Sequence, residues 1–220
     1  MRFLITMSIL LVVLASAAFA GSVDVATSFP AFQGQNGFRA LAYNPDTGGF
    51  RDLQDLSSIA PKFYGTPEQP ANMPSLRLVT EGVRFLPAWQ RTVHGTEWPV
   101  LSFMASETGT YSVTGSFSNG NTAGATTRGV IFVNNSATSP LFTGNVTITQ
   151  SAAFQIAGLH LNQGDYLRFG VDPLGSDSYD NTILNAVILN SPVGAQTPEP
   201  GSLLAIASGL VGLVAMRRRK

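Results

Sequence analysis

Residues 110–118 read TYSVTGSFS, and this stretch decides the fold class. Its large apolar side chains, Tyr111, Val113 and Phe117, lie at alternate positions, and Gly115 fills the gap between the last two. Every other position holds Ser or Thr. A strand with one buried face has this period of two, whereas an amphipathic helix spaces its apolar residues by three and four. The stretch therefore predicts a β-strand that lies with one face against a core.

Further strands with the same character follow toward the C-terminus. Residues 165–171 alternate again, with Leu167, Phe169 and Val171 on one side. Residues 183–189 (ILNAVIL) form a nearly continuous apolar run, which suits a strand buried in a sandwich. The other predicted strands cover residues 100–105, 129–133, 146–149 and 154–161, and Gly- and Asn-containing turns separate them. Many short strands at this spacing predict an all-β fold, an antiparallel β-sandwich.

The first third of the body is less regular. Residues 33–38 and 46–50 have the composition of turns that precede short strands. A weak helical pattern is confined to residues 53–59. Four prolines in residues 61–75 remove backbone donors, so a long surface loop is predicted there.

The N-terminus has the layout of a secretory signal peptide, residues 1–20. Arg2 supplies the positive charge, residues 3–13 are apolar, and Ala18 and Ala20 give the small-residue cleavage pattern. Cleavage after Ala20 would make Gly21 the first mature residue. The alternative is an uncleaved N-terminal anchor.

The C-terminus combines three elements in a fixed order. Pro198, Glu199 and Pro200 come first, and the uncharged apolar residues 201–216 follow. A helix of this length rises about 24 Å, slightly less than a hydrocarbon core of about 30 Å, and we expect it to be a transmembrane helix. The chain then ends in four basic residues, which the positive-inside rule keeps cytoplasmic: Arg217, Arg218, Arg219 and Lys220.

This tail, residues 198–220, resembles the PEP-CTERM sorting domain of exported bacterial proteins. The resemblance rests on the Pro-Glu-Pro motif, the short apolar span and the terminal Arg cluster. It implies recognition by an exosortase, a membrane peptidase that cuts at or near the motif, after export through the secretion translocon and processing by signal peptidase. The protein would be anchored in the inner membrane in transit and then reach the cell surface or the extracellular matrix. A plain C-terminal anchor is the alternative.

Between these ends lies one domain, residues 21–193, followed by a short linker, residues 194–197. Arg2 and the four terminal residues account for 5 of the 13 basic residues, and Glu199 for 1 of the 13 acidic ones. The body thus holds 8 basic and 12 acidic residues, a net charge of −4 with His neutral. This excludes a broad basic surface for nucleic acid. The absence of Cys excludes disulfides, a thiol nucleophile and thiolate metal sites.

Residues 100–189 resemble the jelly-roll domains of many exported PEP-CTERM proteins, which are similar in plan to carbohydrate-binding modules. The motif Asn36-Gly37-Phe38, with Tyr43 further on, resembles the Asn-Gly-aromatic segment near the start of those domains. One departure is that Leu101-Ser102-Phe103 stands where those domains often have an Arg-Trp pair. No role of that pair is carried over.

Catalytic patterns are scarce in the body. Its two histidines are His94, in a Gly-flanked turn, and His160, which the strand pattern turns toward solvent. The carboxylates of Glu81, Glu97 and Glu107 offer pairs for glycoside hydrolysis, but sequence spacing does not bring any two of them together. We therefore expect no enzyme activity.

An acidic loop near the end of the body is a candidate calcium site. Four oxygen-bearing side chains that suit a hard cation occur within ten residues: Asp172, Asp177, Asp180 and Asn181. The spacing fits no EF-hand loop. A solvated turn, in which the Asp side chains accept from nearby backbone amides, explains the pattern better.

Aromatic side chains are the candidates for contacting a glycan, because sugar C–H groups pack on aromatic faces. These residues are Tyr43, Tyr64, Trp89, Trp98 and Tyr179, with Tyr64 expected to be the most exposed. Core filling is the alternative for each, since a sandwich of this size needs large side chains.

The sequence therefore predicts a non-catalytic protein of the cell surface or biofilm matrix that is sorted by its tail and binds exopolysaccharide. A hydrolase of envelope or matrix polysaccharide is the alternative.

Overall fold

The computed structural model describes residues 21–58, 60–66, 74–87, 96–121, 126–175 and 181–192. The chain divides into two compact units, of which one is Gly21–Asn190 and the other combines Met1–Ala20 with Ser191–Lys220. The predicted signal peptide and the sorting tail, residues 198–220, lie outside the described residues. Within the described part, no helix has the length and apolar character needed to cross a membrane.

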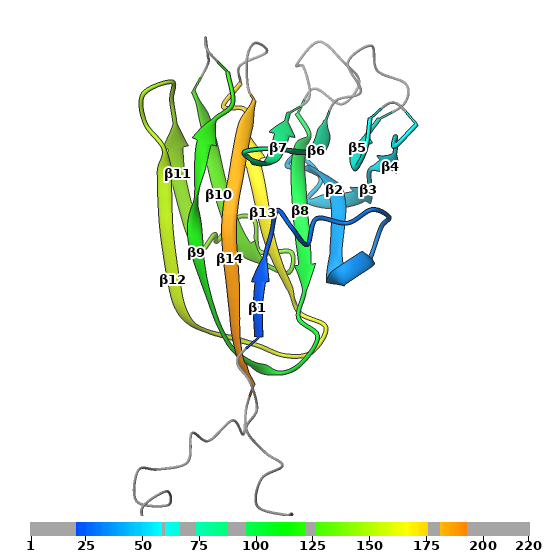
Figure 1. Cartoon of the computed structure of the whole chain (residues 1–220). Helices are drawn as coiled ribbons and strands as arrows, with labels where there is room; N and C mark the ends of the chain where they lie inside the picture. The colour runs from blue at the N-terminus through cyan, green and yellow to red at the C-terminus, as the bar shows by residue number, and fades with distance from the viewer. Residues whose placement is uncertain are drawn as a thin grey trace, which may run out of the picture. The chain divides into compact units, whose positions relative to one another are not determined.

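The described residues of the first unit form two antiparallel sheets, in the strand order shown in Figure 1. The eight-stranded sheet runs β12 (Ala152–Leu161), β9 (Gly109–Asn119), β14 (Thr182–Pro192), β7 (Gly82–Leu86), β6 (Ser75–Val79), β5 (Phe63–Gly65) and β4 (Gln54–Asp55), and β1 (Gly21–Asp24) also pairs with β14. The six-stranded sheet runs β11 (Phe142–Val146), β10 (Thr127–Val133), β13 (Tyr166–Asp172), β8 (Trp98–Met104), β2 (Phe38–Asn44) and β3 (Gly49–Asp52). The prediction of an all-β, antiparallel sandwich is confirmed.

The core lies between the inner faces of the two sheets. Tyr111, Val113 and Phe117 of β9 are buried there, as the alternation of residues 110–118 predicts. Across the interface, the six-stranded sheet contributes the predicted inward set of β13, namely Leu167, Phe169 and Val171. Burying large aliphatic and aromatic side chains stabilises a sandwich that has no disulfide.

A glycine allows the two sheets to approach closely beside Phe117. A Cβ placed on Gly129 of β10 would lie 2.3 Å from the Phe117 ring. The ring of one sheet therefore occupies the space that a side chain would take on the other. This complementarity explains why a glycine interrupts the apolar pattern of β10.

The strand β14 differs in part from its prediction. Leu184, Ala186 and Ile188 point into the core. On the other face Ile183 is buried, but Leu189 is 43% exposed. The apolar run is thus buried on both faces only at its start, and its end presents an apolar side chain to solvent.

Two local predictions are wrong, and the weak helical pattern at residues 53–59 does not produce a helix in its described part, where the short strand β4 lies instead. The Pro-rich region holds β5, so it is not loop throughout, since cross-strand pairing with β6 needs no donor from the prolines. The strand predicted at residues 146–149 ends at Val146 in β11, and a turn closed by a bridge between Thr147 and Gln150 follows it.

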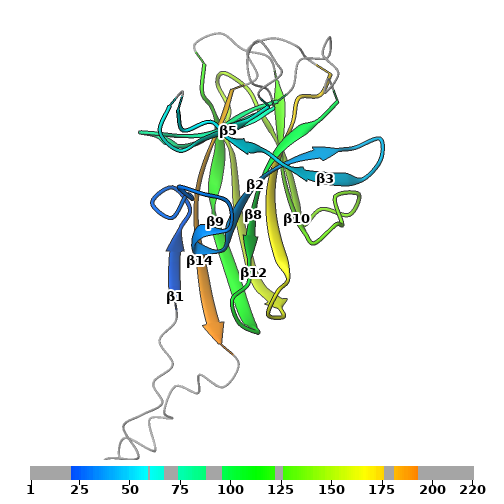
Figure 2. The same cartoon turned by 90° about the vertical axis from the view of Figure 1, so that its right-hand side faces the viewer.

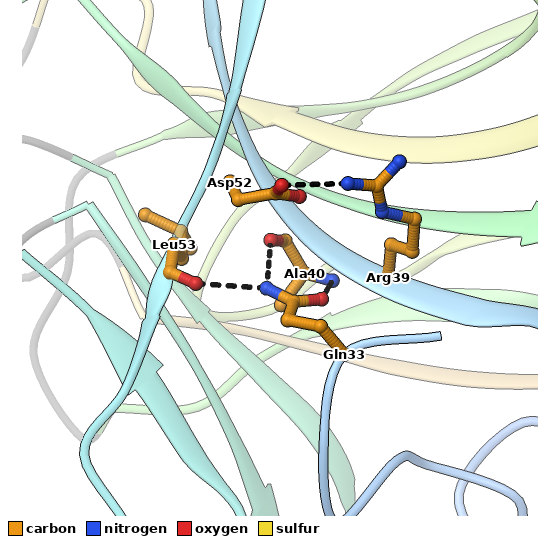
Figure 3. A network of polar contacts seen from close by, with 5 residues as sticks. All are labelled: Gln33, Arg39, Ala40, Asp52 and Leu53. Atoms are coloured by element: carbon orange, nitrogen blue, oxygen red, sulfur yellow. Dashed lines mark hydrogen bonds and ion pairs between the residues drawn. The ribbon is translucent and has the colours of Figure 1, made fainter. Parts of the chain in front are cut away.

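The segment before β2 is fixed by the side chain of Gln33, as Figure 3 shows. Its amide nitrogen donates to the carbonyl oxygens of Ala40 (2.7 Å) and Leu53 (2.8 Å), and its amide oxygen accepts from the Ala40 backbone nitrogen (2.8 Å). The Gln33 side chain thus links β2 to the residue that follows β3, and it satisfies backbone groups of both Ala40 and Leu53. Beside it, Arg39 forms an ion pair with Asp52 of β3 at 2.6 Å.

Candidate functional site

The outer face of the six-stranded sheet carries a second apolar cluster. We define the outer aromatic cluster as Tyr43, Phe50, Trp98 and Phe132, which pack with aliphatic side chains of β2, β8 and β10. Tyr43 pairs in register with both Phe50 and Trp98, and its ring centroid lies 4.8 Å from that of Phe50 and 5.3 Å from that of Trp98. These edge and tilted contacts are the ones that aromatic rings favour.

The β2–β3 hairpin folds over this face. Strand β3 is separated from β10 by β13, β8 and β2 in the sheet order, which in a flat sheet would be about 19 Å at the usual spacing of neighbouring strands. The rings of Phe50 on β3 and Phe132 on β10 are nevertheless 6.2 Å apart. Figure 2 shows β2 and β3 crossing β8 and β10. The hairpin thus converts an outer face into a small second core.

Arg168 lies beneath this hairpin. It is 7% exposed, its guanidinium carbon lies 3.8 Å from the centre of the Phe50 ring, and it donates to Asn135 Oδ1 at 2.9 Å. Burial lowers the pKa of this guanidinium, and the nearby charge of Arg39 acts in the same direction. No carboxylate in the described part of the chain pairs with it. Arg168 is therefore a buried cation stabilised by a ring and an amide.

Two ion pairs lie where β8 begins and β13 ends. Glu97, just before β8, pairs with Arg51 of β3 at 2.5 Å. Asp172, the last residue of β13, pairs with Arg128 of β10. Trp98 follows Glu97 directly and is only partly buried. Trp98 thus presents a partly accessible indole beside the partly exposed side chain of Arg51, whereas Glu97 is buried.

The aromatic candidates differ in how far they are buried. The prediction that Tyr64 is exposed is wrong, because it is fully buried in β5, donates to the Pro30 carbonyl at 3.1 Å, and has its pKa raised to about 12, mainly by burial. Tyr43 is buried in the outer aromatic cluster. Trp98 stays a candidate, and Trp89 and Tyr179 lie outside the described residues.

The candidate calcium ligands are only partly described. Asp172 is paired with Arg128, and its second oxygen accepts from the Leu174 backbone nitrogen at 2.9 Å. Asn181 donates to Asn121. Asp177 and Asp180 lie outside the described residues. Among the residues that the structure describes, no group of three or more metal-binding side chains comes together.

The candidate catalytic residues are dispersed over the described part of the fold. Glu97 precedes β8, Glu107 follows it and accepts from Asn190 at 2.6 Å, and Glu81 lies in the β6–β7 turn. His160 is exposed, as the strand pattern predicts. His94 lies outside the described residues.

Of the processing residues, only Gly21 is described, as the first residue of β1. The cleavage residues Ala18 and Ala20, the motif Pro198, Glu199 and Pro200, and the basic end from Arg217 to Lys220 lie outside the described residues.

The contact between Arg168 and Phe50 on the outer face was not predicted from the sequence. A signal was present in residues 129–133 (GVIFV), where a continuous apolar run indicates a strand covered on both faces. The element that covers it, a hairpin far away in the sequence, left no local signal.

Residues 196–220 match the family model described as the PEP-CTERM protein-sorting motif. The chain therefore carries this sorting motif, as its resemblance implied. No curated protein matches the chain.

Among solved structures, the chain is similar to a carbohydrate-binding module, CBM36, in complex with calcium and xylotriose, at 11% identity over 78% of this chain and 99% of the other, with a TM-score of 0.32. It is also similar to a family 35 carbohydrate-binding module from Clostridium thermocellum, at 19% identity over 76% of this chain and 98% of that one, with a TM-score of 0.33.

Proposed function

We propose that this chain is an exported, non-catalytic protein of the cell surface or extracellular matrix, sorted through its C-terminal motif and able to bind exopolysaccharide. The observation that carries the proposal is the match of residues 196–220 to the sorting motif. In this proposal residues 1–20 are a signal peptide, residues 201–216 are a transmembrane helix, and an exosortase cuts at or near Pro198.

The fold supports double processing of this kind. Gly21, the first residue after the proposed signal cleavage, pairs in register with Asn190 near the end of β14. The first and last residues of this compact unit, Gly21 and Asn190, thus lie at the same end of the sandwich. We propose that either can be cut while the jelly-roll-like body stays folded, because the core residues lie between Val25 and Ile188.

The sorting part is tested by replacing the motif. A variant with Pro198→Ala, Glu199→Ala and Pro200→Ala is expressed in a bacterium that has an exosortase, beside wild type and a Thr197→Ala control. We expect wild type and control at the cell surface or in the matrix, and the triple variant retained in the inner-membrane fraction. Equal release of all three proteins would contradict sorting through the motif.

The binding part is assigned to the accessible edge of the outer aromatic cluster at Trp98. The partly buried indole beside the Arg51–Glu97 ion pair supports it. The full chain in a non-ionic detergent is applied to a glycan array, beside Trp98→Ala and a control, Phe32→Ala, which removes a 61% exposed aromatic ring outside the cluster.

We expect binding without product release, lost in Trp98→Ala and kept in Phe32→Ala. Release of sugar products that depends on Glu81 or Glu97 would instead favour the hydrolase. Binding that Trp98→Ala leaves unchanged would contradict the assigned face.

A further inference from the structure

Two arginines face each other directly on neighbouring strands of the eight-stranded sheet. Arg77 of β6 pairs in register with Arg84 of β7. Both point to the outer face, because Leu76, Val83 and Phe85, which alternate with them, are in the core. Like charges placed opposite each other on a sheet repel, so this pair destabilises the hairpin unless an anion compensates it.

The pair differs from the other described arginines in its lack of a partner. No ion pair or hydrogen bond joins the side chain of Arg77 or Arg84 to any other residue in the described part of the chain. The Nε of Arg84 is also buried without an acceptor, as are those of Arg128 and Arg168. The others are compensated: Arg39 by Asp52, Arg51 by Glu97, Arg128 by Asp172, and Arg168 by Phe50 and Asn135.

The neighbours of the pair in the same cross-strand row are apolar. The register extends the row on both sides, to Phe63 of β5 beyond Arg77 and to Ile183 of β14 beyond Arg84. Both flanking residues are buried, so neither offers the arginines a compensating charge. Arg77 is exposed and Arg84 partly buried, so an anion in solution can reach the pair.

The position of the pair is fixed by the backbone. Gly82, at the start of β7, has a φ of +140°, and a Cβ there would lie 2.5 Å from the Leu184 carbonyl oxygen of β14. Close contact with β14 therefore holds the β6–β7 hairpin in one place. The turn carboxylate of Glu81 forms no ion pair with either arginine in the described part.

We propose that Arg77 and Arg84 bind carboxylate groups of an acidic polysaccharide. This inference rests on the proposed function and names the class of polymer. A guanidinium presents two parallel N–H donors to the two oxygens of a carboxylate, and a facing pair presents two such forks. The body has 8 basic and 12 acidic residues, so it lacks the broad basic surface that nucleic acid requires, and the facing pair is a local positive site on an acidic body.

Affinity electrophoresis of the full chain in non-ionic detergent tests the inference. The gels contain polygalacturonate, neutral hydroxyethyl cellulose or no polymer, and anionic phosphatidylglycerol vesicles are tested by co-flotation. The variants are Arg77→Gln, Arg77→Gln with Arg84→Gln, and Arg39→Gln as the control. The control removes the same charge as Arg77→Gln, from an arginine that already pairs with Asp52 at 2.6 Å.

We expect polygalacturonate to retard wild type and Arg39→Gln equally, with affinity about tenfold weaker in the double variant, the loss that one or two charge-assisted hydrogen bonds give. The retardation should weaken as salt is added.

Retardation by polygalacturonate that is equal in all variants would overturn the inference, as would pair-dependent binding to the vesicles and not to the polymer. Retardation by the neutral polymer alone would overturn it and leave the proposed function standing. Binding to neither polymer, nor to any glycan of the array, would contradict both.

Discussion

The two sheets of this sandwich share one core but have different outer faces. On the eight-stranded sheet, β9 presents only Ser and Thr outward from Thr110 to Ser118, and the neighbouring β12 presents small or uncharged polar side chains. On the six-stranded sheet, the outer face holds the outer aromatic cluster and the buried Arg168. The outer face of β9 and β12 meets water, whereas the β2–β3 hairpin covers the outer face of the six-stranded sheet at Phe132.

The difference comes from a hairpin and not from the strands. Both sheets bury one face by the same alternation, but on the six-stranded sheet the β2–β3 hairpin also folds back over the outer face. Residues beneath it are excluded from water, so large apolar side chains are favourable on both faces of β10. The comparison therefore predicts that substitutions on the two outer faces differ in effect.

The largest effect is expected at Phe132. Its side chain is fully buried on the outer face, so Phe132→Ala should lower the free energy of unfolding by about 3 to 5 kcal/mol, as in an ordinary core. The matched change on the other outer face, Thr114→Ala, should cost no more than about 0.5 kcal/mol. Urea unfolding followed by tryptophan fluorescence measures both. A cost below about 1 kcal/mol for Phe132→Ala would mean that the hairpin does not cover the face.

A smaller effect is expected at Arg168, and it separates charge from packing. Arg168→Ala removes the contact with Phe50 and leaves a gap, so a loss of about 2 kcal/mol is expected. Arg168→Met keeps an apolar side chain beneath the ring and removes a buried charge, so its stability should stay within about 1 kcal/mol of wild type. If Met is as costly as Ala in thermal unfolding, the charge itself stabilises the face.

A still smaller effect is expected where the hairpin meets solvent. Arg39 and Asp52 are 43% and 47% exposed, so their ion pair is screened by water. Arg39→Gln should cost about 0.5 kcal/mol or less, and the cost should vanish in high salt. A salt-independent loss above 1 kcal/mol in the same urea titration would show that this pair, and not the apolar cluster, holds the hairpin down.

The smallest effect is expected for calcium. Asp172 is already neutralised by Arg128, so millimolar Ca²⁺ should leave the melting temperature of the full chain unchanged. A rise of several degrees by differential scanning fluorimetry, absent with Mg²⁺ and lost in Asp180→Asn, would contradict this and establish a calcium site in the acidic loop.

The sequence predicted the features that depend on residues close together in the chain. Alternation at Tyr111, Val113 and Phe117 identified an inner face, because a strand places side chains on opposite sides whatever its partner is. The sorting motif was also predictable, because it is one continuous stretch of sequence, within residues 196–220.

What the sequence could not predict depends on contacts between distant segments. Tyr64 lies in a Pro-rich segment and was expected to be exposed, but pairing with β6 and contact with Phe29 bury it. Phe50 follows two glycines in a turn-like segment, and its packing on Phe132 needs the β2–β3 hairpin to fold back toward β10. The juxtaposition of Arg77 and Arg84 depends on the register between β6 and β7, which the sequence does not specify.

We propose above that the β-sandwich is exported and then sorted through the C-terminal motif, with removal of the tail. Intact-mass spectrometry of the protein recovered from the cell surface tests it most directly. We predict a chain that begins at Gly21 and has lost the apolar and basic residues after the Pro-Glu-Pro motif. A mature chain that still ends in Arg217, Arg218, Arg219 and Lys220 would contradict sorting and leave the tail as a plain membrane anchor.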